Sequence, residues 1–498
     1  MATLIAEGER KHVVVLGAGP AGLTAAYELL KRNVPVTVLE RDPKQVGGLA
    51  RTVEHNGYRF DIGGHRFFSK NEEVEDLWTE ILGDEMLSRG RLSRIYYRGR
   101  FFAYPIQAFN ALWNLGPIEA ALCLASYARA RLRPVKDPKT LEEWVRNQFG
   151  WRLYSIFFKT YTEKVWGIST KELSADWAAQ RIKSLDLWVV IRNALLPKRK
   201  PGKRGDIVTT LIDRFRYPRF GPGQMWERVA DIAAAAGHPV QLGRSVTRIH
   251  HANGAVTAVE TDSGTFAGTD FISSIPIREL INRLEPPAPE RIRKAADSLA
   301  YRDFISIALM VDRAEVFPDN WIYVHDPGVK VGRIQNFKNW SPDMVPDQSK
   351  TCLGLEYFCF EGDGLWTSPD AELIALARKE LAHLGICSES EVFDGVVVRQ
   401  QKAYPVYDDS YQAHVGAVRD YLASSLPNLH LAGRNGMHKY NNQDHSMMTA
   451  LLVARNIATS STLDPWKVNA DAVYHEDIKL GERDPSGRQV PERIPAKV

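Results

Sequence analysis

The chain has 498 residues, of which 44% are hydrophobic and 25% are charged, and its formal net charge is +4. This length is sufficient for two or three packed units, and the small net charge gives no argument for nucleic-acid binding. No run reaches the roughly 18 apolar residues of a membrane-spanning helix, and the N-terminus lacks the apolar core of a signal peptide. We therefore expect a cytoplasmic protein with neither a nucleic acid nor a membrane as partner.

The cysteines give no sign of a disulfide framework or of a metal site. The chain has four of them: Cys123, Cys352, Cys359 and Cys387. They form no C-x-x-C pair and no spacing that is typical of metal ligands. We predict free thiols in a reducing compartment and no bound metal.

The first predicted elements are a strand, a glycine turn and a helix. Segment 12–16 is apolar and mostly β-branched, which predicts a buried parallel strand. Three glycines in the spacing G-x-G-x-x-G follow it: Gly17, Gly19 and Gly22. Pro20 stands where a helix over 20–30 would begin, a position that tolerates its missing N–H.

A second predicted strand, 36–39, ends at Glu40. In such a unit the first glycine allows the tight turn, the second lets a pyrophosphate approach the backbone, and the third lets the helix pack closely on the strand. The acid after the second strand can accept hydrogen bonds from ribose hydroxyls. The unit predicts a dinucleotide site, and we prefer this interpretation to a purely structural glycine turn.

A second glycine pair, Gly47-Gly48, follows soon after Glu40. An extended FAD molecule needs another close approach of the backbone, whereas a simple NAD site does not, so we predict FAD. Next, Gly63 and Gly64 precede His65. This histidine is either an ordinary turn residue or a residue that lies against the flavin ring.

The middle of the chain predicts a hairpin and a helical region. A helix is expected over 72–82, a hairpin over 93–102 with its turn near Arg98-Gly99, and helices throughout most of 105–188. The basic segment 196–206 carries two prolines. It is either a solvated linker, which we favour, or a mobile flap near an anionic ligand.

The second half of the chain predicts a sheet. Segment 215–223 is rich in turn residues, a helix is expected over 225–236, a hairpin over 240–259 and a strand over 270–277. Five strand-like runs and one helix, 370–384, then predict a largely antiparallel sheet that serves as a substrate platform. A last buried strand, 429–433, returns to the FAD unit, and the segment beyond 464 predicts an extended tail.

A helix is expected to begin near Asp444, just after the turn at Gly433-Arg434. A helix N-terminus carries about half a positive charge. Aimed at the pyrimidine edge of a flavin, it would stabilise the anionic reduced ring. A capped structural helix explains Asp444 or Ser446 alone, but it leaves Arg434 and Tyr440 without a role.

Three motifs together resemble those of the UDP-galactopyranose mutases, flavoenzymes that interconvert pyranose and furanose forms of a nucleotide-bound sugar. They are FDIGGHRFFSK at 60–70, YTEKVWG at 161–167 and GR…KY…NQDHSMM at 433–448. Ile106 departs from the pattern, since eukaryotic members carry an aromatic residue there to stack on uracil. The base is therefore left open, as is the sugar.

We predict an α/β fold: a Rossmann-like FAD-binding domain, a helical domain and an antiparallel β-sheet substrate domain. The FAD domain is expected to combine segments 1–104, 206–277 and 425–463. The helical domain is expected over 105–205, the sheet domain over 278–424 and the tail over 464–498.

The resemblance implies an FAD-dependent mutase that acts on a nucleotide-diphosphate sugar and is active with reduced FAD. Flavin N5 would attack the anomeric carbon, and NADPH or NADH would be the expected reductant. The alternatives are an FAD oxidoreductase of the amine-oxidase, protoporphyrinogen-oxidase or desaturase type, and a catalytically idle FAD-binding scaffold. A homo-oligomer is compatible with either enzyme.

The resemblance also implies roles for individual residues. Catalytic roles fall on His65, Arg434, Tyr440, Arg181 and Arg333. Cofactor-binding roles fall on Gly17, Gly19, Pro20, Ala21, Gly22, Glu40, Arg41, Gly47, Gly48, Leu49, Gly64, His65, Gly433, Arg434, Asn442, Gln443, Asp444 and Ser446. Substrate-binding roles fall on Tyr104, Gln107, Trp166, Arg181, Tyr323, Arg333, Tyr404 and Tyr440. Arginines give forked, charged donors to phosphate oxygens, and tyrosines add neutral donors.

Overall fold

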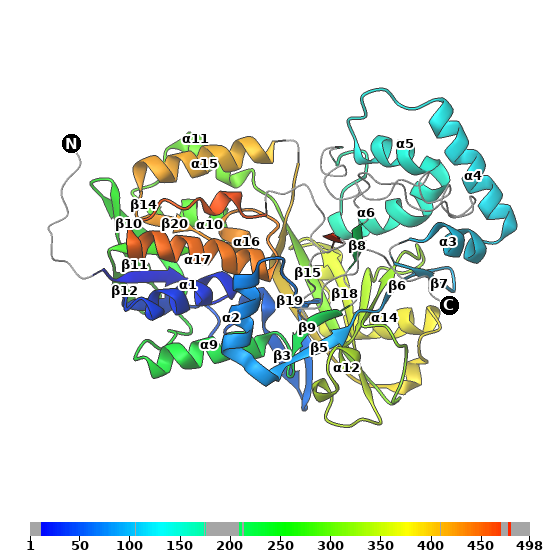
Figure 1. Ribbon diagram of the computed structural model, residues 1–498, viewed down its shortest axis with the longest axis horizontal. Helices are drawn as coiled ribbons and strands as arrows, with labels where there is room; N and C mark the ends of the chain where they lie inside the picture. The colour runs from blue at the N-terminus through cyan, green and yellow to red at the C-terminus, as the bar shows by residue number, and fades with distance from the viewer. Residues whose placement is uncertain are drawn as a thin grey trace.

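A computed structural model describes residues 11–104, 106–173, 175, 209–211, 214–408, 410–469 and 477–479. The predicted basic loop 196–206 and Arg181 lie outside these residues. Figure 1 shows three parts: a parallel-sheet unit on the left, a helical unit at the upper right and a large sheet at the lower right. The predicted α/β fold class is confirmed.

A four-stranded parallel sheet in the order β2-β1-β13-β20 forms the centre of the first part. Its strands are β1 (Val13–Leu16), β2 (Val36–Leu39), β13 (Asp270–Ser273) and β20 (Leu429–Leu431). Side chains alternate across β1, so Val13 and Val15 join one hydrophobic core while Val14 and Leu16 join another. Because both faces are covered, an almost wholly apolar strand is required here.

Helices cover both faces of this sheet. The first core contains residues of α1 (Pro20–Lys31), α2 (Glu72–Leu82), α9 (Gly223–Ala235) and α17 (Gln443–Thr459). The second core contains residues of α10 (Ile277–Asn282), α11 (Glu290–Asp297) and α15 (Tyr411–Ser425). The helices predicted over 72–82 and 225–236 and near Asp444 are confirmed.

A second four-stranded sheet, in the order β12-β11-β10-β14, flanks the second core. Its strands are β10 (Val246–Ala252), β11 (Ala255–Thr261), β12 (Gly264–Ala267) and β14 (Leu284–Glu285). The hairpin predicted within 240–259 is confirmed, since β10 and β11 are antiparallel and turn at Asn253 and Gly254. Both residues have positive φ, 51° and 80°.

The large sheet has seven strands in the order β19-β15-β18-β17-β16-β6-β7. They are β6 (Ser93–Tyr97), β7 (Arg100–Ala103), β15 (Tyr301–Val311), β16 (Trp321–Val324), β17 (Arg333–Asn336), β18 (Thr351–Cys359) and β19 (Val392–Pro405). The predicted antiparallel character is confirmed, with the β16–β6 pair as a parallel exception. The predicted hairpin at 93–102 is also confirmed and joins this sheet.

One face of the large sheet packs against α14 (Asp370–His383), where Ile305, Ile307 and Leu309 share a core with Leu373 and Leu381. The opposite face carries the alternate residues of β15, among them Phe304 and Ser306. This second face points toward the segment around Gly63, because a Cβ on that glycine would lie 3.7 Å from Phe304 Cζ.

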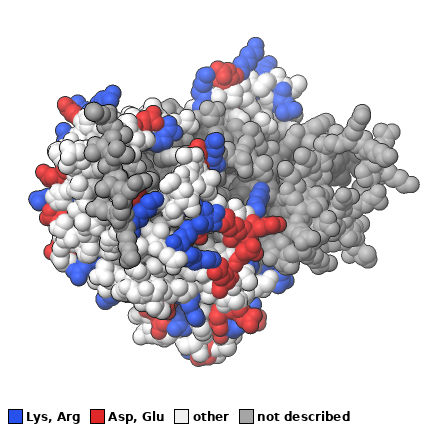
Figure 2. Space-filling model, turned by 60° about the vertical axis from the view of Figure 1, so that its left-hand side comes forward, with Lys and Arg blue, Asp and Glu red and all other residues white. Residues whose placement is uncertain are grey.

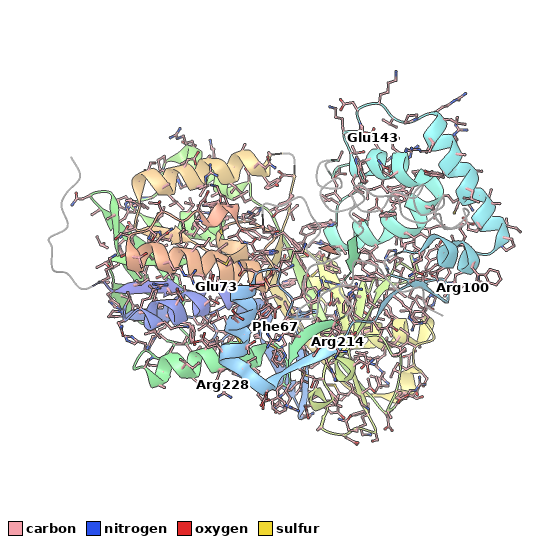
Figure 3. The ribbon with its side chains drawn as sticks, in the orientation of Figure 1. Phe67, Glu73, Arg100, Glu143, Arg214 and Arg228 are labelled. Carbon is pink, nitrogen blue, oxygen red and sulfur yellow. The ribbon has the colours of Figure 1, made fainter. Side chains whose placement is uncertain are left out.

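The helical unit confirms the prediction of helices after residue 105, within the residues described. It comprises α3 (Ala108–Leu115), α4 (Pro117–Leu132), α5 (Leu141–Tyr154), a π-helix (Ser155–Lys159) and α6 (Thr160–Trp166). Glu143 marks this unit in Figure 3, and Arg100 marks the neighbouring edge strand β7. Gly167 ends α6 with φ +68°, and a Cβ there would lie 2.4 Å from Arg302 Cζ. The buried Arg302 guanidinium donates to the last carbonyls of α6, which fixes this helix on the sheet.

The interpretation of 215–223 as turns is wrong in its first part. Residues Arg214–Pro218 form β9, which pairs with β5 (Met86–Gly90). Phe215 and Tyr217 alternate with polar residues and are fully buried, so burial outweighs the turn residues nearby. Phe67, which bridges to Arg216, appears between Glu73 and Arg214 in Figure 3.

The remaining short elements connect these parts. They are β3 (Thr52–His55), β4 (Tyr58–Asp61), β8 (Thr209–Leu211), β21 (Asp477–Lys479), α12 (Phe337–Trp340), α13 (Gly364–Thr367) and α16 (Gly433–Gly436).

On the face in Figure 2, basic and acidic side chains lie beside each other, in keeping with the small net charge. Within the described residues, none of the helices combines the length and the apolarity needed to span a membrane. The four cysteines are buried free thiols, as predicted.

Candidate functional site

Five glycines after β1 and β2 form what we call the glycine cradle: Gly17, Gly19, Gly22, Gly47 and Gly48. Gly17 has φ +102°, which only glycine adopts readily. A Cβ on Gly22 would lie 1.8 Å from Gly17 O, so the helix can approach the turn only without a side chain there. A Cβ on Gly48 would lie 3.2 Å from Gly19 Cα, so two bare backbone segments face each other.

Gly19 differs from its neighbours because internal packing does not require it. A Cβ there would meet only Gly48 Cα, at the ordinary contact distance of 3.8 Å. Gly19 also precedes α1 and gives it no side-chain cap, and Pro20 is the first helical residue. The N-terminus of α1 therefore offers backbone N–H groups and a positive dipole end, the arrangement that binds phosphate groups.

Glu40 lies at the end of β2 and is 8% exposed. Its two carboxylate oxygens accept from Ala18 N at 2.7 Å and from Asp42 N at 2.9 Å. These bonds fix the carboxylate against the cradle, and each oxygen retains a lone pair for a ribose hydroxyl. Leu49 and Ala21 also lie at the cradle, whereas Arg41 is exposed. The cradle and Glu40 thus fit the dinucleotide part of FAD.

The start of α17 carries four predicted cofactor residues. Asn442 caps the helix together with His445. Gln443 Oε1 accepts from Trp226 Nε1 at 3.2 Å, and Gln443 Nε2 is buried without a hydrogen-bond partner among the described residues. Ser446 is buried in the first turn. The unsatisfied Gln443 donor at a positive helix end suits a carbonyl oxygen of a bound cofactor.

Asp444 connects the start of α17 to the histidine segment. Its Oδ2 accepts from Ser69 Oγ at 3.1 Å. Burial raises the pKa of the Asp444 carboxyl to about 7. This carboxyl therefore changes its charge near neutral pH, between the first turn of α17 and Ser69.

Three neighbouring strands place polar side chains in one row on the large sheet. Tyr323 on β16 is opposite Arg333 on β17, and Arg333 is opposite Glu356 on β18. Because side chains alternate in a strand, Gln335 shares the face of Arg333. The register brings together four residues that lie up to 33 positions apart in sequence, from 323 to 356.

Arg333, Gln335, Glu356, Tyr404 and His65 form what we call the polar cluster. Glu356 is fully buried, and its Oε2 lies 2.5 Å from Arg333 Nε. Its Oε1 accepts from Gln335 Nε2 at 2.7 Å. Arg333 Nη2 donates to Tyr404 Oη at 3.1 Å. A buried carboxylate is tolerated here because one oxygen accepts a hydrogen bond and the other forms an ion pair.

His65 lies on the loop that faces this row. A Cβ on Gly63 would be 3.8 Å from both His65 Cε1 and Glu356 Oε1, and a Cβ on Gly64 would be 2.8 Å from Gln335 Nε2. Burial, with help from Arg434 and Arg333, lowers the pKa of His65 to about 3. The imidazole is therefore neutral at neutral pH, and it acts through hydrogen bonds rather than charge.

The loop before His65 rests on a buried acid. Tyr217 Oη donates to Asp61 Oδ2 at 2.7 Å, and both residues are fully buried. Burial raises the pKa of the Asp61 carboxyl well above its ordinary value. Asp61 and Tyr217 thus anchor the loop rather than forming part of a solvent-exposed site.

The predicted tyrosines form two aromatic groups around Arg333. Tyr323 contacts Tyr104 and Tyr161, with ring centroids 4.8 and 5.6 Å apart. Tyr404 stacks on Tyr440 at 5.6 Å, and Trp166 lies 6.4 Å from Tyr440. Cross-strand pairing joins the first group to Arg333, and the Tyr404 hydrogen bond joins the second.

Arg434 lies beside the second aromatic group. Its guanidinium carbon is 5.3 Å from the Tyr404 ring centroid and 5.1 Å from that of Tyr440. It also donates to Asn441 O and Ala403 O, at 2.8 and 2.9 Å. Gly433, with φ +81°, begins α16 next to it, and a Cβ there would lie 2.8 Å from Ala21 Cβ.

The structure thus brings together most of the predicted substrate residues, but not all. Gln107 is exposed at the N-terminus of α3, and no contact of its side chain with the polar cluster is found among the described residues. Arg181 lies outside the described residues, so its role stays a prediction. Sequence reasoning missed Gln335 and Glu356. A signal existed for the acid, because an ionisable residue in the centre of the apolar run LGLEYF needs a buried partner.

A family model described as "Flavin containing amine oxidoreductase" matches residues 20–458. Among curated proteins, phytoene dehydrogenase of Streptomyces griseus is 27% identical over 279 residues, 51% of this chain and 52% of that protein. The dTDP-fucopyranose mutase of Escherichia coli is 29% identical over 170 residues, 33% of this chain and 44% of that protein. The matches span about half the length of these relatives.

A crystal structure of reduced UDP-galactopyranose mutase superposes with a TM-score of 0.79. It is 22% identical, and the match covers 93% of this chain and 99% of that one. This identity is too low to transfer an activity, but the two proteins share an FAD-binding fold.

Proposed function

The chain belongs to the flavin containing amine oxidoreductases, and on this premise we propose that it is a mutase with bound FAD. Its substrate would be a nucleotide-diphosphate sugar, whose pyranose and furanose forms it would interconvert. The observation that carries the proposal is the polar cluster with its tyrosines. An apolar substrate would leave an arginine and several phenols without ligand partners.

Arg333 is the main candidate for the diphosphate. Its Nε forms the ion pair with Glu356, and its Nη2 donates to Tyr404. A guanidinium has five N–H donors, so others are left for phosphate oxygens. The Glu356 carboxylate fixes the orientation of the Arg333 guanidinium. Arg181 would supply a second positive charge for the diphosphate.

The other residues would orient the substrate and exclude water. Tyr404 and Tyr440 present phenol groups beside Arg333 and Arg434, and Trp166 closes the same side. A bound, reduced flavin would supply a nucleophilic nitrogen for the anomeric carbon. The neutral His65 would face this reaction without adding a positive charge. NADPH or NADH would be the source of electrons.

An FAD-dependent oxidoreductase is the second candidate. The specific observation in its favour is Glu356, because its charge offsets that of Arg333 and reduces the attraction for an anionic diphosphate. The similarity to phytoene dehydrogenase points in the same direction. The two candidates differ in the consumption of electrons per product.

The test is to reduce the FAD-loaded protein once, without oxygen, by dithionite or NADPH, and to add UDP-, GDP- or dTDP-sugars. We expect many turnovers per reduction, with pyranose and furanose forms separated by chromatography. The oxidised protein is the matched control and should be inactive. Consumption of one oxygen or one NADPH per product would instead establish the oxidoreductase.

A further inference from the structure

In the side-chain amide of Gln335, the nitrogen has a hydrogen-bond partner and the oxygen has none in the described structure. The residue is 1% exposed, and its Nε2 donates to Glu356 Oε1 at 2.7 Å. Its Oε1 is buried and has no hydrogen-bond partner among the described residues. The orientation of the amide is not arbitrary, because a carboxylate paired with Arg333 only accepts hydrogen bonds. The NH2 group must face Glu356, and Oε1 must face away from it.

A second unsatisfied atom lies on the neighbouring loop. His65 Nδ1 is buried and also lacks a hydrogen-bond partner within the described part of the chain. The two residues converge on the Gly63-Gly64 turn. A Cβ on Gly64 would be 3.3 Å from Gln335 Oε1, and a Cβ on Gly63 would be 3.8 Å from His65 Cε1.

Across the described ranges, the structure pairs neither atom with a neighbouring side chain. Glu356 already accepts from Gln335 and faces Arg333, and Asp61 accepts from Tyr217. Buried polar atoms without a partner are rare in native proteins and point to a group that is not part of the chain. Water is one such group, and a ligand that displaces it must supply equivalent hydrogen bonds.

The chemistry of the two atoms selects the ligand group. A carboxamide oxygen accepts only, so it requires an O–H or N–H donor. A neutral imidazole nitrogen accepts or donates according to its tautomer. A hydroxyl group fits both atoms, because it donates and accepts, whereas an alkyl chain or a phosphate oxygen does not fit the amide oxygen. Neighbouring sugar hydroxyls meet both requirements at once.

We infer that Gln335 Oε1 and His65 Nδ1 form a hydroxyl-binding subsite that takes the sugar of the substrate, not its diphosphate. This inference rests on the proposed function. Glu356 is the positioning residue of the subsite, since it fixes the direction of the Gln335 amide. Arg333 would then bind the charged diphosphate of the ligand, and the neutral acceptors of the subsite would bind its sugar.

The test compares Gln335→Met with the wild-type protein and with Gln348→Met, a matched control at an exposed glutamine. Calorimetry on the oxidised, FAD-loaded proteins gives affinities for UDP and UDP-galactose, and for dTDP and dTDP-fucose. We expect Gln335→Met to bind UDP and dTDP like the wild type, but to lose about tenfold in affinity for the sugars. The control should match the wild type for all four.

A second measurement uses deoxy analogues of the bound sugar with the wild-type protein. Removal of one particular hydroxyl should cost about the same tenfold, and the same removal should cost nothing further in Gln335→Met. Equal loss of nucleotide and sugar affinity, or no loss of either, overturns the subsite while the proposed function stands. Failure of the wild type to bind any nucleotide sugar overturns both.

Discussion

The glycine cradle and the polar cluster are built in opposite ways. The cradle lies within residues 17–48 and presents backbone, and three of its glycines have positive φ close to the turns that require it. The polar cluster draws on residues 65, 333, 335, 356 and 404, and it presents side chains held by sheet register. A site for a group common to a whole family can be local, whereas the part that selects a substrate depends on distant segments.

The largest expected effect comes from breaking the cradle with Gly22→Val. A Cβ there would lie 1.8 Å from Gly17 O, so the helix must move away from the turn. We expect no stable FAD-loaded protein, measured by the flavin absorbance of the purified fraction. Gly416→Val on α15 is the control, because a Cβ there meets nothing within 4 Å. Normal flavin content in Gly22→Val would contradict the close packing described.

In the polar cluster, the corresponding change removes the negative charge that pairs with Arg333. Glu356→Gln leaves the Arg333 guanidinium, whose side chain is 21% exposed, without its counter-ion, at a cost of up to about 3 kcal/mol in the free energy of unfolding. Chemical denaturation measures this. The double variant Glu356→Gln/Arg333→Met should recover much of the loss, since it removes the unpaired charge. If the single and the double variant are equally destabilised, the unpaired charge of Arg333 is not the cause of the lost stability.

The third effect develops gradually with pH and concerns Asp444, which links the start of α17 to Ser69. Its folded-state pKa, about 7, is raised above the ordinary value of 3.8. The stabilisation is therefore fully present below that ordinary value and is lost as the pH rises toward 7. Relative to Asp444→Asn, the unfolding free energy of the wild type should fall over this range by up to about 1.4 kcal/mol per pH unit. Parallel pH profiles of the two proteins would contradict this assignment.

Several features could be predicted because their causes are local. The spacing of Gly17, Gly19 and Gly22 after an apolar run predicts the turn, the helix and the approach of a phosphate from one short segment. Period-two alternation and turn residues located the hairpins at 93–102 and 240–259. Segment 411–425 was missed as a helix, because only Val418 and Leu422 of it are buried and its apolar pattern is weak.

The sequence by itself therefore determined the cradle, most of the helices and strands, and the presence of residue types that are suited to phosphate groups. The tertiary structure decided which of those residues act together. The resemblance of the chain to the UDP-galactopyranose mutases was enough to propose Arg333 as a ligand of the diphosphate. The pairing of Arg333 with Glu356, however, depends on the register of β17 and β18. The buried orientation of Gln335 follows from that pairing. Register is fixed by the packing of whole strands, and residue spacing along the chain does not encode it locally.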